Sequence, residues 1–393
     1  MFIALRDLRF ARGRFALMAA VVAMVALLMV LLTGLSTGLA DDNVSAIAHL
    51  PATHLSFSVE SGVVFNQSTV TADQWTAMQS VPGVADAAPV GSSLFNGHVY
   101  ATKAEADRAR NEVLATGKAT STDGPPLNIA MFGVEPGSFV APSPTSGQAL
   151  TKGSDGVVVS EDFATKKNVK IGEILVLDRV GTQLPVVGIT GKNNYGHVPV
   201  VFAPLTVWSQ ATFGDTAAGG RNVATFIALR TDSGFDVAAA DQAHHLTTVT
   251  RTAAFNGSPG YKEETGTLLM IELFLYVIAG LLVAAFFTVW TIQRTSEIGL
   301  LKALGARTFY VIRDALGQAA IILVGATAIG VFGGLGLGAI MPGNAPFALQ
   351  PAPVIGAAVL LVIMGLLGAL GSVRRIAKVD PIIALTGATG GPR

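Results

Sequence analysis

Four long apolar runs divide the chain and predict its architecture. The first covers roughly residues 15–39, and the others cover residues 267–292, 314–341 and 354–373. About 20 consecutive apolar residues in a helix span the hydrocarbon core of a bilayer, so each run predicts a transmembrane helix. Residues 41–266, between the first two runs, are far more polar. The pattern therefore predicts a four-span membrane protein with one large domain outside the bilayer.

Basic residues mark one side of that membrane. They precede the first run (Arg6, Arg9, Arg12, Arg14), lie between the second and third (Arg294, Lys302, Arg307, Arg313) and follow the fourth (Arg374, Arg375, Lys378). Cytoplasmic segments are enriched in Lys and Arg. We therefore expect both termini, the connection 293–313 and the tail 374–393 in the cytoplasm. Residues 41–266 are then extracytoplasmic, and the protein is a multi-pass protein of the cell membrane.

Residues 1–40 are predicted to hold an interfacial helix followed by the first span. Apolar and basic side chains fall on different faces of MFIALRDLRF, as in helices that lie on the inner leaflet; a frayed basic tail is the alternative. The apolar run could also be a cleaved signal peptide. It is longer than the about 7–15 apolar residues of a signal sequence, which favours a retained helix.

The connection 293–313 reads QRTSEIGLLKALGARTFYVIR and alternates charged and apolar positions at helical spacing. A short amphipathic helix on the cytoplasmic side suits the docking of a soluble partner. An ordinary connecting helix is the alternative.

The external segment mixes two kinds of apolar pattern. β-branched runs broken by Gly, Asn and Pro predict strands at 157–160, 174–177, 185–190 and 198–202, and helical spacing predicts helices at 103–114, 161–167 and 235–247. This mixture predicts an α+β domain with two lobes.

Composition agrees with a membrane protein and excludes several kinds of chemistry. Of 393 residues, 51% are hydrophobic and 13% charged, against about 25% charged in an average soluble domain. Acidic and basic residues balance at 26 each, which gives no indication of a nucleic-acid partner. Cysteine is absent, so disulfides, thiolate metal sites and cysteine nucleophiles are excluded.

No motif indicates catalysis. Lys118 and Lys192 follow glycines but are not followed by Ser or Thr, so neither completes a phosphate-binding loop. The adjacent His244 and His245 lack zinc-ligand spacing, and the one G-x-S-x-G match, at 34–38, lies inside the first span, where no nucleophile elbow can form. We predict no catalytic residue, no metal site and no resident cofactor, and we expect the energy for any work to come from a partner.

Several segments resemble the FtsX/MacB-type permeases of ATP-binding-cassette exporters. These are SEIGLLKALGAR at 296–307, RRIAKVDPIIALTG at 374–387, VPGV at 81–84 and GVVVSEDFATKKNVKIGEILVL at 156–177. The resemblance covers nearly the whole chain. It implies the type VII exporter fold, a MacB-like arrangement of one span, a large external domain and then three spans, as the apolar pattern also predicts.

The resemblance further implies partners. It implies a homodimer of permeases in membrane lipid, bound to two copies of a cytoplasmic ATP-binding-cassette ATPase whose closure moves the external domain. In this sequence the coupling helix that docks on the ATPase would present charged contacts (Glu297, Lys302) and an apolar face (Ile298, Leu301, Leu304). Gly305 would end that helix as its C-cap.

Within the family, the N-terminal segment and the single external domain resemble the DevC/HrtB branch, which includes haem exporters and glycolipid exporters. Two functions remain open. The first is an export permease for an amphipathic substrate, with haem first and a glycolipid or membrane-active peptide next. The second is a non-transporting mechanotransmitter that drives an extracytoplasmic partner.

A substrate taken from the outer leaflet would meet the outer ends of the first two spans. Glu272 lies about one turn inside the second span, and an ionisable group in a span is a functional candidate. Met270 and Tyr276 lie near it in sequence, and Met29 lies on the first span; haem iron accepts Met or Tyr ligands. Glu272 could instead snorkel to the interface, and Met29 could serve packing. Further external candidates are Glu60, between Phe57 and Phe65, and the histidines His49 and His54.

Overall fold

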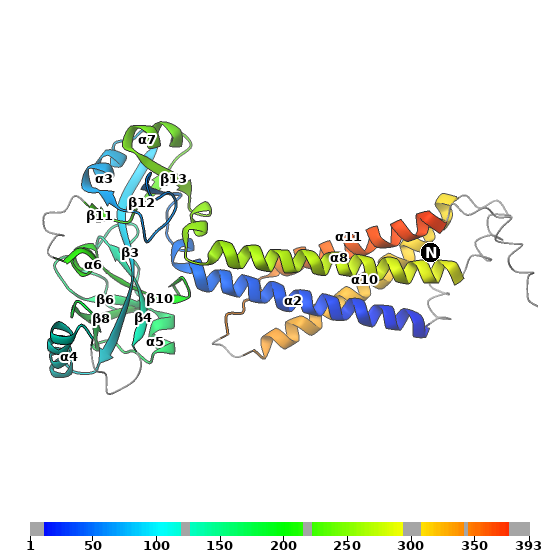
Figure 1. Cartoon of the computed structure of the whole chain (residues 1–393), viewed down its shortest axis with the longest axis horizontal. Helices are drawn as coiled ribbons and strands as arrows, with labels where there is room; N and C mark the ends of the chain where they lie inside the picture. The colour runs from blue at the N-terminus through cyan, green and yellow to red at the C-terminus, as the bar shows by residue number, and fades with distance from the viewer. Residues whose placement is uncertain (1–11, 119–125, 215–221, 294–307, 342–344, 377–393) are drawn as a thin grey trace, which may run out of the picture. The chain divides into compact units, whose positions relative to one another are not determined.

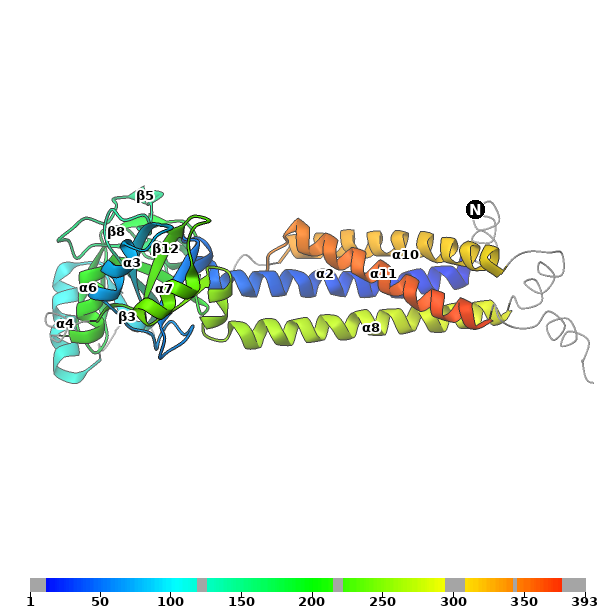
Figure 2. The same ribbon diagram turned by 90° about the horizontal axis from the view of Figure 1, so that it is seen from above.

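The computed structural model describes residues 12–118, 126–214, 222–293, 308–341 and 345–376 (Figures 1 and 2). The chain divides into two compact units. We call Leu39–Glu264 the external domain, and Met1–Gly38 with Thr265–Arg393 the helical unit.

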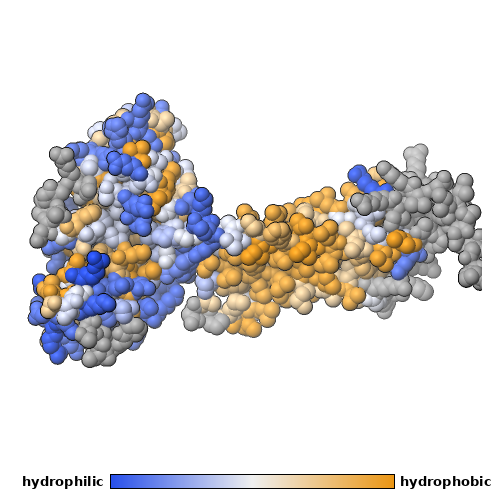
Figure 3. All heavy atoms as spheres, viewed as in Figure 1, coloured by the Kyte–Doolittle hydropathy of each residue, from blue (hydrophilic) through white to orange (hydrophobic). Residues whose placement is uncertain are grey.

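The helical unit is built from long apolar helices. They are α2 (Arg12–Ala48), α8 (Tyr261–Gln293), α10 (Thr308–Ala339) and α11 (Pro351–Ile376). Each is long and apolar enough to cross a membrane, and the face of the unit drawn in Figure 3 is hydrophobic over most of its length. The predicted fold class, four transmembrane helices with a large external domain between the first and second, is confirmed.

Two of these helices extend beyond the predicted spans. α2 continues to Ala48, and α8 begins at Tyr261. The added turns carry polar residues such as Asp42 and Glu264. A prediction from hydropathy alone therefore places the boundary of each helix several residues inside its true end. Both helices therefore run without interruption into residues of the external domain.

Glycines allow close packing inside the helical unit. Gly330 of α10 lies against Ala23 and Ala26 of α2, and Gly368 of α11 lies against the backbone of Gly280 on α8. A side chain at such a contact would push the helices apart.

Gly34 and Gly38 on α2 serve a different purpose from the helix pairing that their spacing suggests. A β-carbon at either position would collide with the connection between α10 and α11, at Phe347 and the Pro346 backbone. The amide of Ala348 also donates to the Gly34 carbonyl at 3.0 Å. Gly34 and Gly38 therefore make room for the connection between α10 and α11 rather than for a neighbouring helix.

The external domain has one large mixed sheet that is flanked by short helices (Figure 1). Its strands are β1 (His54–Ser58), β3 (Val84–Tyr100), β4 (Leu127–Val134), β5 (Ser146–Gly147), β6 (Val157–Ser160), β7 (Ile174–Leu177), β8 (Gln183–Thr190), β9 (Asn194–Tyr195), β10 (Val198–Pro204), β12 (Phe226–Thr231) and β13 (Leu246–Thr250). A separate pair joins β2 (Val70–Thr71) to β11 (Asn222–Ala224). The helices are α3 (Ala72–Gln79), α4 (Lys103–Thr116), α5 (Glu161–Lys166), α6 (Leu205–Phe213), α7 (Val237–His244) and the 3-10 turn η2 (Ala253–Gly257).

The long strand β3 connects the two parts of this sheet. Its first half pairs with β12, which leads to β1 and β13. Its second half pairs with β4 and β7 and closes a circuit β3–β4–β10–β6–β8–β7. Successive side chains of β4 point to opposite faces and enter two different hydrophobic cores. Ile129 and Met131 pack in the core inside this circuit, and Ala130 and Phe132 pack in a separate core on the other face of β4.

Most of the predicted elements of the external domain are present. Strands β6 and β7 coincide with the predicted runs, and α4 and α5 confirm the predicted helices. The prediction of one helix over residues 235–247 is wrong at its end. His245 adopts a left-handed conformation with φ 55° and stops α7, and the β-branched residues that follow form β13.

Trp208 of α6 packs against a pair of glycines, and this contact predicts a large effect of mutation. Gly91 of β3 and Gly133 of β4 face each other in register, and a β-carbon on either would meet the Trp208 side chain. Overpacking a closed core costs about 1–3 kcal/mol. We expect Gly133→Val to lower the free energy of unfolding by about that amount, measured by guanidinium unfolding with tryptophan fluorescence.

The matched control is Gly191→Ala, because Gly191 has open space where a β-carbon would stand and no positive φ. Equal stability of the Gly133→Val and Gly191→Ala proteins would contradict this packing.

Candidate functional site

A carboxylate and a hydroxyl meet between α2 and α8 within the helical unit. Thr33 Oγ1 donates a hydrogen bond of 3.5 Å to Glu272 Oε1, across 239 positions of sequence. Thr33 is 6% exposed and Glu272 is partly buried. The contact is long, but it gives Glu272 a polar partner on the other helix. A snorkelling side chain would not require one.

Two other predicted residues pack beside this pair for a reason of helix geometry. Met29 precedes Thr33 by four positions and Tyr276 follows Glu272 by four, so each lies on the same helix face as its neighbour. Met29 and Tyr276 accordingly belong to one buried cluster with Ala26, Ala279 and Leu361. The structure thus brings together Glu272, Tyr276 and Met29.

The exposure of the candidates differs greatly. Met29 is 2% and Tyr276 is 7% exposed, so in this arrangement both act as packing around the pair. Met270 is 58% exposed on the outward face of α8. A ligand would therefore reach Glu272 first, and Met29 would contact it only after α2 and α8 separate.

The chemistry of this site is that of a single acid in an apolar wall. An ionised carboxylate accepts several hydrogen bonds, and Thr33 supplies one, which leaves acceptor capacity for a cationic or metal-bearing group. Within the described ranges, no cluster of three or more His, Asp or Glu side chains has the geometry of a metal centre. The roles of Glu272, Met29, Met270 and Tyr276 in substrate binding remain predictions.

Thr33 escaped the sequence analysis. A hydroxyl in an apolar span commonly bonds its own helix backbone, so it gives little signal by itself. The one indication in the sequence was its spacing, because a residue four positions after Met29 lies on the same helix face as that candidate.

Glu60 has a different environment in the external domain. It is exposed on the turn after β1, whereas its neighbours Phe57 and Phe65 are fully buried and meet edge to face at 4.9 Å. Those rings are core residues and do not frame Glu60. His49 Nδ1 pairs with Asn193 Oδ1 at 3.1 Å and His54 Nδ1 with Thr231 Oγ1 at 3.0 Å, so both histidines have protein partners.

The predicted coupling residues Glu297, Ile298, Leu301, Lys302, Leu304 and Gly305 lie outside the described residues.

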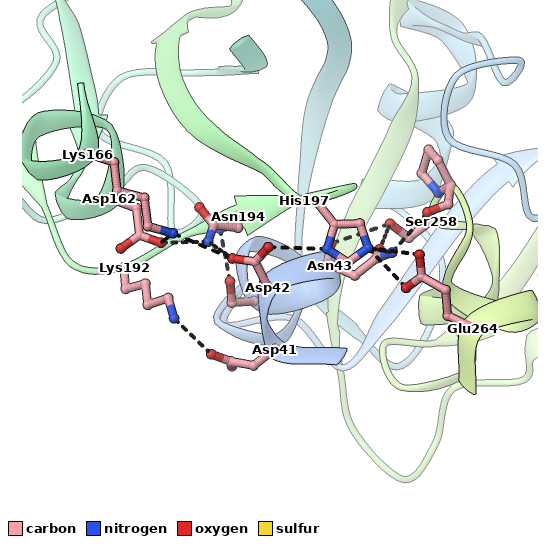
Figure 4. A network of polar contacts seen from close by, with 12 residues as sticks. Asp41, Asp42, Asn43, Asp162, Lys166, Lys192, Asn194, His197, Ser258 and Glu264 are labelled. Carbon is pink, nitrogen blue, oxygen red and sulfur yellow. Dashed lines mark hydrogen bonds and ion pairs between the residues drawn. The ribbon is translucent and has the colours of Figure 1, made fainter. Parts of the chain in front are cut away.

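The external domain contains a polar network that sequence analysis missed (Figure 4). It surrounds the end of α2 that lies in this domain. Its members are Asp41, Asp42, Asn43, Ser45, Asp162, Lys166, Lys192, Asn194, His197, Ser258, Pro259 and Glu264. The Asp-Asp-Asn triplet after the first apolar run was visible in sequence, but its partners come from distant parts of the chain, among them α5, β9 and the start of α8.

His197 joins two helices in this network. Its Nδ1 lies 3.2 Å from Asp42 Oδ2 on α2, and its Nε2 lies 3.0 Å from both carboxylate oxygens of Glu264 on α8. We call this contact the Asp42–His197–Glu264 bridge. His197 lies in a turn with φ 62°, a conformation that few residues other than glycine adopt, which aims its ring between the two helices.

The other side of the network ties α2 to α5. Asn194 Nδ2 donates to Asp42 Oδ1 and to Asp162 Oδ2, each at 2.7 Å, and Lys166 pairs with Asp162 at 3.1 Å. Burial raises the pKa of Asp162, but the hydrogen bonds from Asn194 and Lys166 and the nearby lysine charges outweigh it and hold that pKa below its usual range. This contribution to stability is present at neutral pH and is lost as the pH falls through the lowered pKa.

Comparison with known proteins identifies related sequences. Residues 15–245 match the MacB-like periplasmic core domain and residues 269–381 match the FtsX-like permease C-terminal domain. A Staphylococcus haemolyticus protein named "Putative hemin transport system permease protein HrtB" is 23% identical over 98% of this chain and 99% of its own length. Its Staphylococcus epidermidis namesake is 31% identical over 52% of this chain, and that match spans 56% of the relative.

Two further matches are weaker. The macrolide export protein MacB of Wolinella succinogenes is 31% identical over 30% of this chain and 18% of its own. The extracellular domain of the transporter YknZ is 12% identical with a TM-score of 0.32, over 50% of this chain and 99% of that domain. A TM-score this low carries no weight, so the assignment rests on the sequence matches. They confirm the predicted resemblance, and the chain belongs to the FtsX-like permeases that carry a MacB-like periplasmic core domain.

Proposed function

We propose that the chain is the permease subunit of an ATP-binding-cassette efflux system. A separate cytoplasmic ATPase subunit would hydrolyse ATP, and the permease would use that energy to export an amphipathic substrate, haem, from the membrane. Family membership supports the permease role. The relatives named as hemin transport permeases support haem as cargo, one of them along nearly its entire length.

The observation that carries the proposal is the Thr33–Glu272 pair. An acid in a membrane helix is unfavourable unless it meets a polar group or a ligand, and Thr33 satisfies only one acceptor position. Haem combines a flat apolar ring with an iron that takes Met or Tyr ligands, and ferric iron, a hard cation, also accepts carboxylate oxygen. Glu272 and the apolar side chains around it on α8 match that combination.

The assembly we propose is a permease homodimer with two ATPase subunits. The outward face of α8 is strongly apolar, with Leu269, Phe274 and Leu281 each at least 60% exposed. Such a face suits lipid or the matching helix of a second permease. Cargo bound at Glu272 would then lie between α2 and α8 near this face.

The proposed orientation has both termini in the cytoplasm and can be tested with single cysteines. The native chain has none, so labelling has no background. Asn111→Cys, on the exposed surface of α4, is expected to react in intact cells with a membrane-impermeant maleimide, whereas Thr308→Cys, at the start of α10, is not. Labelling at Thr308→Cys alone, or at both positions, would overturn the orientation.

The function itself is tested with purified protein and haemin. We expect a Soret band shift on haemin addition and haemin-stimulated ATP turnover in the complex with the ATPase. No shift, together with normal haemin tolerance of cells that lack the chain, would exclude haem and move a glycolipid or membrane-active peptide ahead.

A non-transporting mechanotransmitter is the second candidate. It is favoured by the unbroken continuation of α2 and α8 into residues that the polar network anchors in the external domain. ATP-dependent activation of an extracytoplasmic partner, with no substrate stimulation of ATP turnover, would support it.

A further inference from the structure

The Asp42–His197–Glu264 bridge places a carboxylate at each nitrogen of one imidazole (Figure 4). A carboxylate is an acceptor, and a neutral imidazole carries only one N–H. The neutral ring can therefore donate to Asp42 or to Glu264, but not to both. Both contacts are favourable only when each ring nitrogen bears a proton.

Asn43 offers the neutral ring an alternative partner. Its amide orientation is fixed, because Nδ2 donates to the Pro259 carbonyl at 2.9 Å and Oδ1 accepts from Ser258 Oγ at 2.6 Å. The same Nδ2 lies 3.2 Å from His197 Nε2. A neutral ring with its proton on Nδ1 would donate to Asp42 and accept from Asn43, and its Nε2 lone pair would then repel Glu264.

The charged side chains around the ring are mostly acidic. Among the described members of the network, acids outnumber bases: α2 contributes Asp41 and Asp42, α5 contributes Asp162 and Lys166, and α8 contributes Glu264. The other base in this network is Lys192, which lies 3.6 Å from Asp41, while Lys166 lies 3.9 Å from Asp42. A positive imidazole therefore offsets part of an acidic environment.

We propose that the Asp42–His197–Glu264 bridge is a proton-operated clamp between α2 and the first turn of α8. It is closed when His197 is doubly protonated. When the pH rises and His197 loses a proton, the ring keeps Asp42 and Asn43 and releases Glu264. Histidine is the side chain that ordinarily changes charge between about pH 5 and 8, so the clamp responds to the pH outside the cell membrane.

The clamp gives the external domain a regulatory role, and this consequence rests on the proposed function. α2 and α8 each continue into a predicted membrane span. With Glu264 held, the ends of the two helices in the external domain move as one body. With Glu264 released, the start of α8 can move independently of α2. Acid conditions would then restrict the movement that accompanies transport.

The test is hydrogen exchange of the full-length chain in lipid nanodiscs, compared between variants at the same pH. His197→Gln removes the charge, and His197→Arg supplies a permanent one. His49→Gln is the matched control, because His49 is exposed and pairs with Asn193 rather than with two acids. The segment that is followed is 258–264, where the Glu264 amide bonds to the Gly260 carbonyl.

At about pH 5.5 we expect this segment to exchange about threefold to tenfold faster in His197→Gln than in the native chain. That factor is typical of one partly solvated, charge-assisted hydrogen bond. At about pH 8 the difference should disappear, and His197→Arg should exchange more slowly than the native chain. His49→Gln should follow the native chain at both pH values.

If His197→Gln speeds the exchange of segment 258–264 by the same factor at both pH values, proton operation is overturned. An equal increase of exchange in His49→Gln would also overturn it. ATP turnover of the complex separates this inference from the proposed function. If exchange behaves as expected but turnover in native and His197→Arg complexes has the same pH profile, the clamp stands and its link to transport fails.

Discussion

Leu301→Pro is expected to reduce permease-dependent ATP turnover to the level of the isolated ATPase. Leu301 lies in the connection that is predicted to be cytoplasmic, outside the described residues, at the centre of the predicted coupling helix. Proline in a helix interior costs about 3 kcal/mol or more, and a helix of a few turns has little intrinsic stability to offset it. The docking surface should therefore be lost while the rest of the permease folds.

Leu301→Ala is the matched control for the coupling helix. Alanine keeps helix propensity and removes only apolar contact, so a partial loss of turnover is expected. Expression, and normal guanidinium unfolding of the external domain, show that Leu301→Pro has folded. Substrate-stimulated turnover at the native rate in Leu301→Pro would remove residues 296–306 from the coupling role.

Glu272→Ala is expected to weaken haemin binding about tenfold or more. Hydrogen bonds to a charged group contribute about 1.5–3 kcal/mol, and about 1.4 kcal/mol corresponds to a tenfold change in affinity. Expression should not fall, because removing a carboxylate from a membrane helix relieves an unfavourable insertion term. Haemin titration by Soret absorption and haemin-stimulated ATP turnover measure the effect.

Two further variants separate the roles of the pair. Glu272→Gln keeps an acceptor for Thr33 and removes the charge, whereas Thr33→Val keeps the shape and removes the hydroxyl. We expect Glu272→Gln to weaken haemin binding as much as Glu272→Ala does. Thr33→Val and Met29→Ala should each weaken it less. Loss of haemin binding in Glu60→Ala with native affinity in Glu272→Ala would place the cargo site in the external domain.

Local patterns in the sequence determined most of the architecture. Apolar runs of sufficient length locate the spans because every backbone group in a bilayer must be bonded within its own segment. Strands β6 and β7 were predictable because a run of three valines in β6 and of four aliphatic residues in β7 each follows a glycine-containing segment. His245 was not readable as a helix stop, because a left-handed residue that is not glycine leaves no compositional sign.

The strand β3 could not be predicted from the local sequence pattern. It runs for 17 residues through alanines, serines and glycines that have little strand preference. It is a strand because β12, β4 and β7 supply its hydrogen-bond partners. Gly91 and Gly133 have no side chains to form a pattern, and they matter because the register sets them opposite each other under Trp208.

The candidate sites divide in the same way. The sequence by itself determined that Glu272 is an acid inside a span and that Asp41 and Asp42 follow the first span, because these are facts of position along one helix. Only the tertiary structure decided that Thr33 bonds Glu272 and that His197 lies between Asp42 and Glu264. Such partners are 67 to 239 positions apart. Periodicity describes how one element presents its own faces, whereas the pairing of distant faces depends on how the whole chain packs.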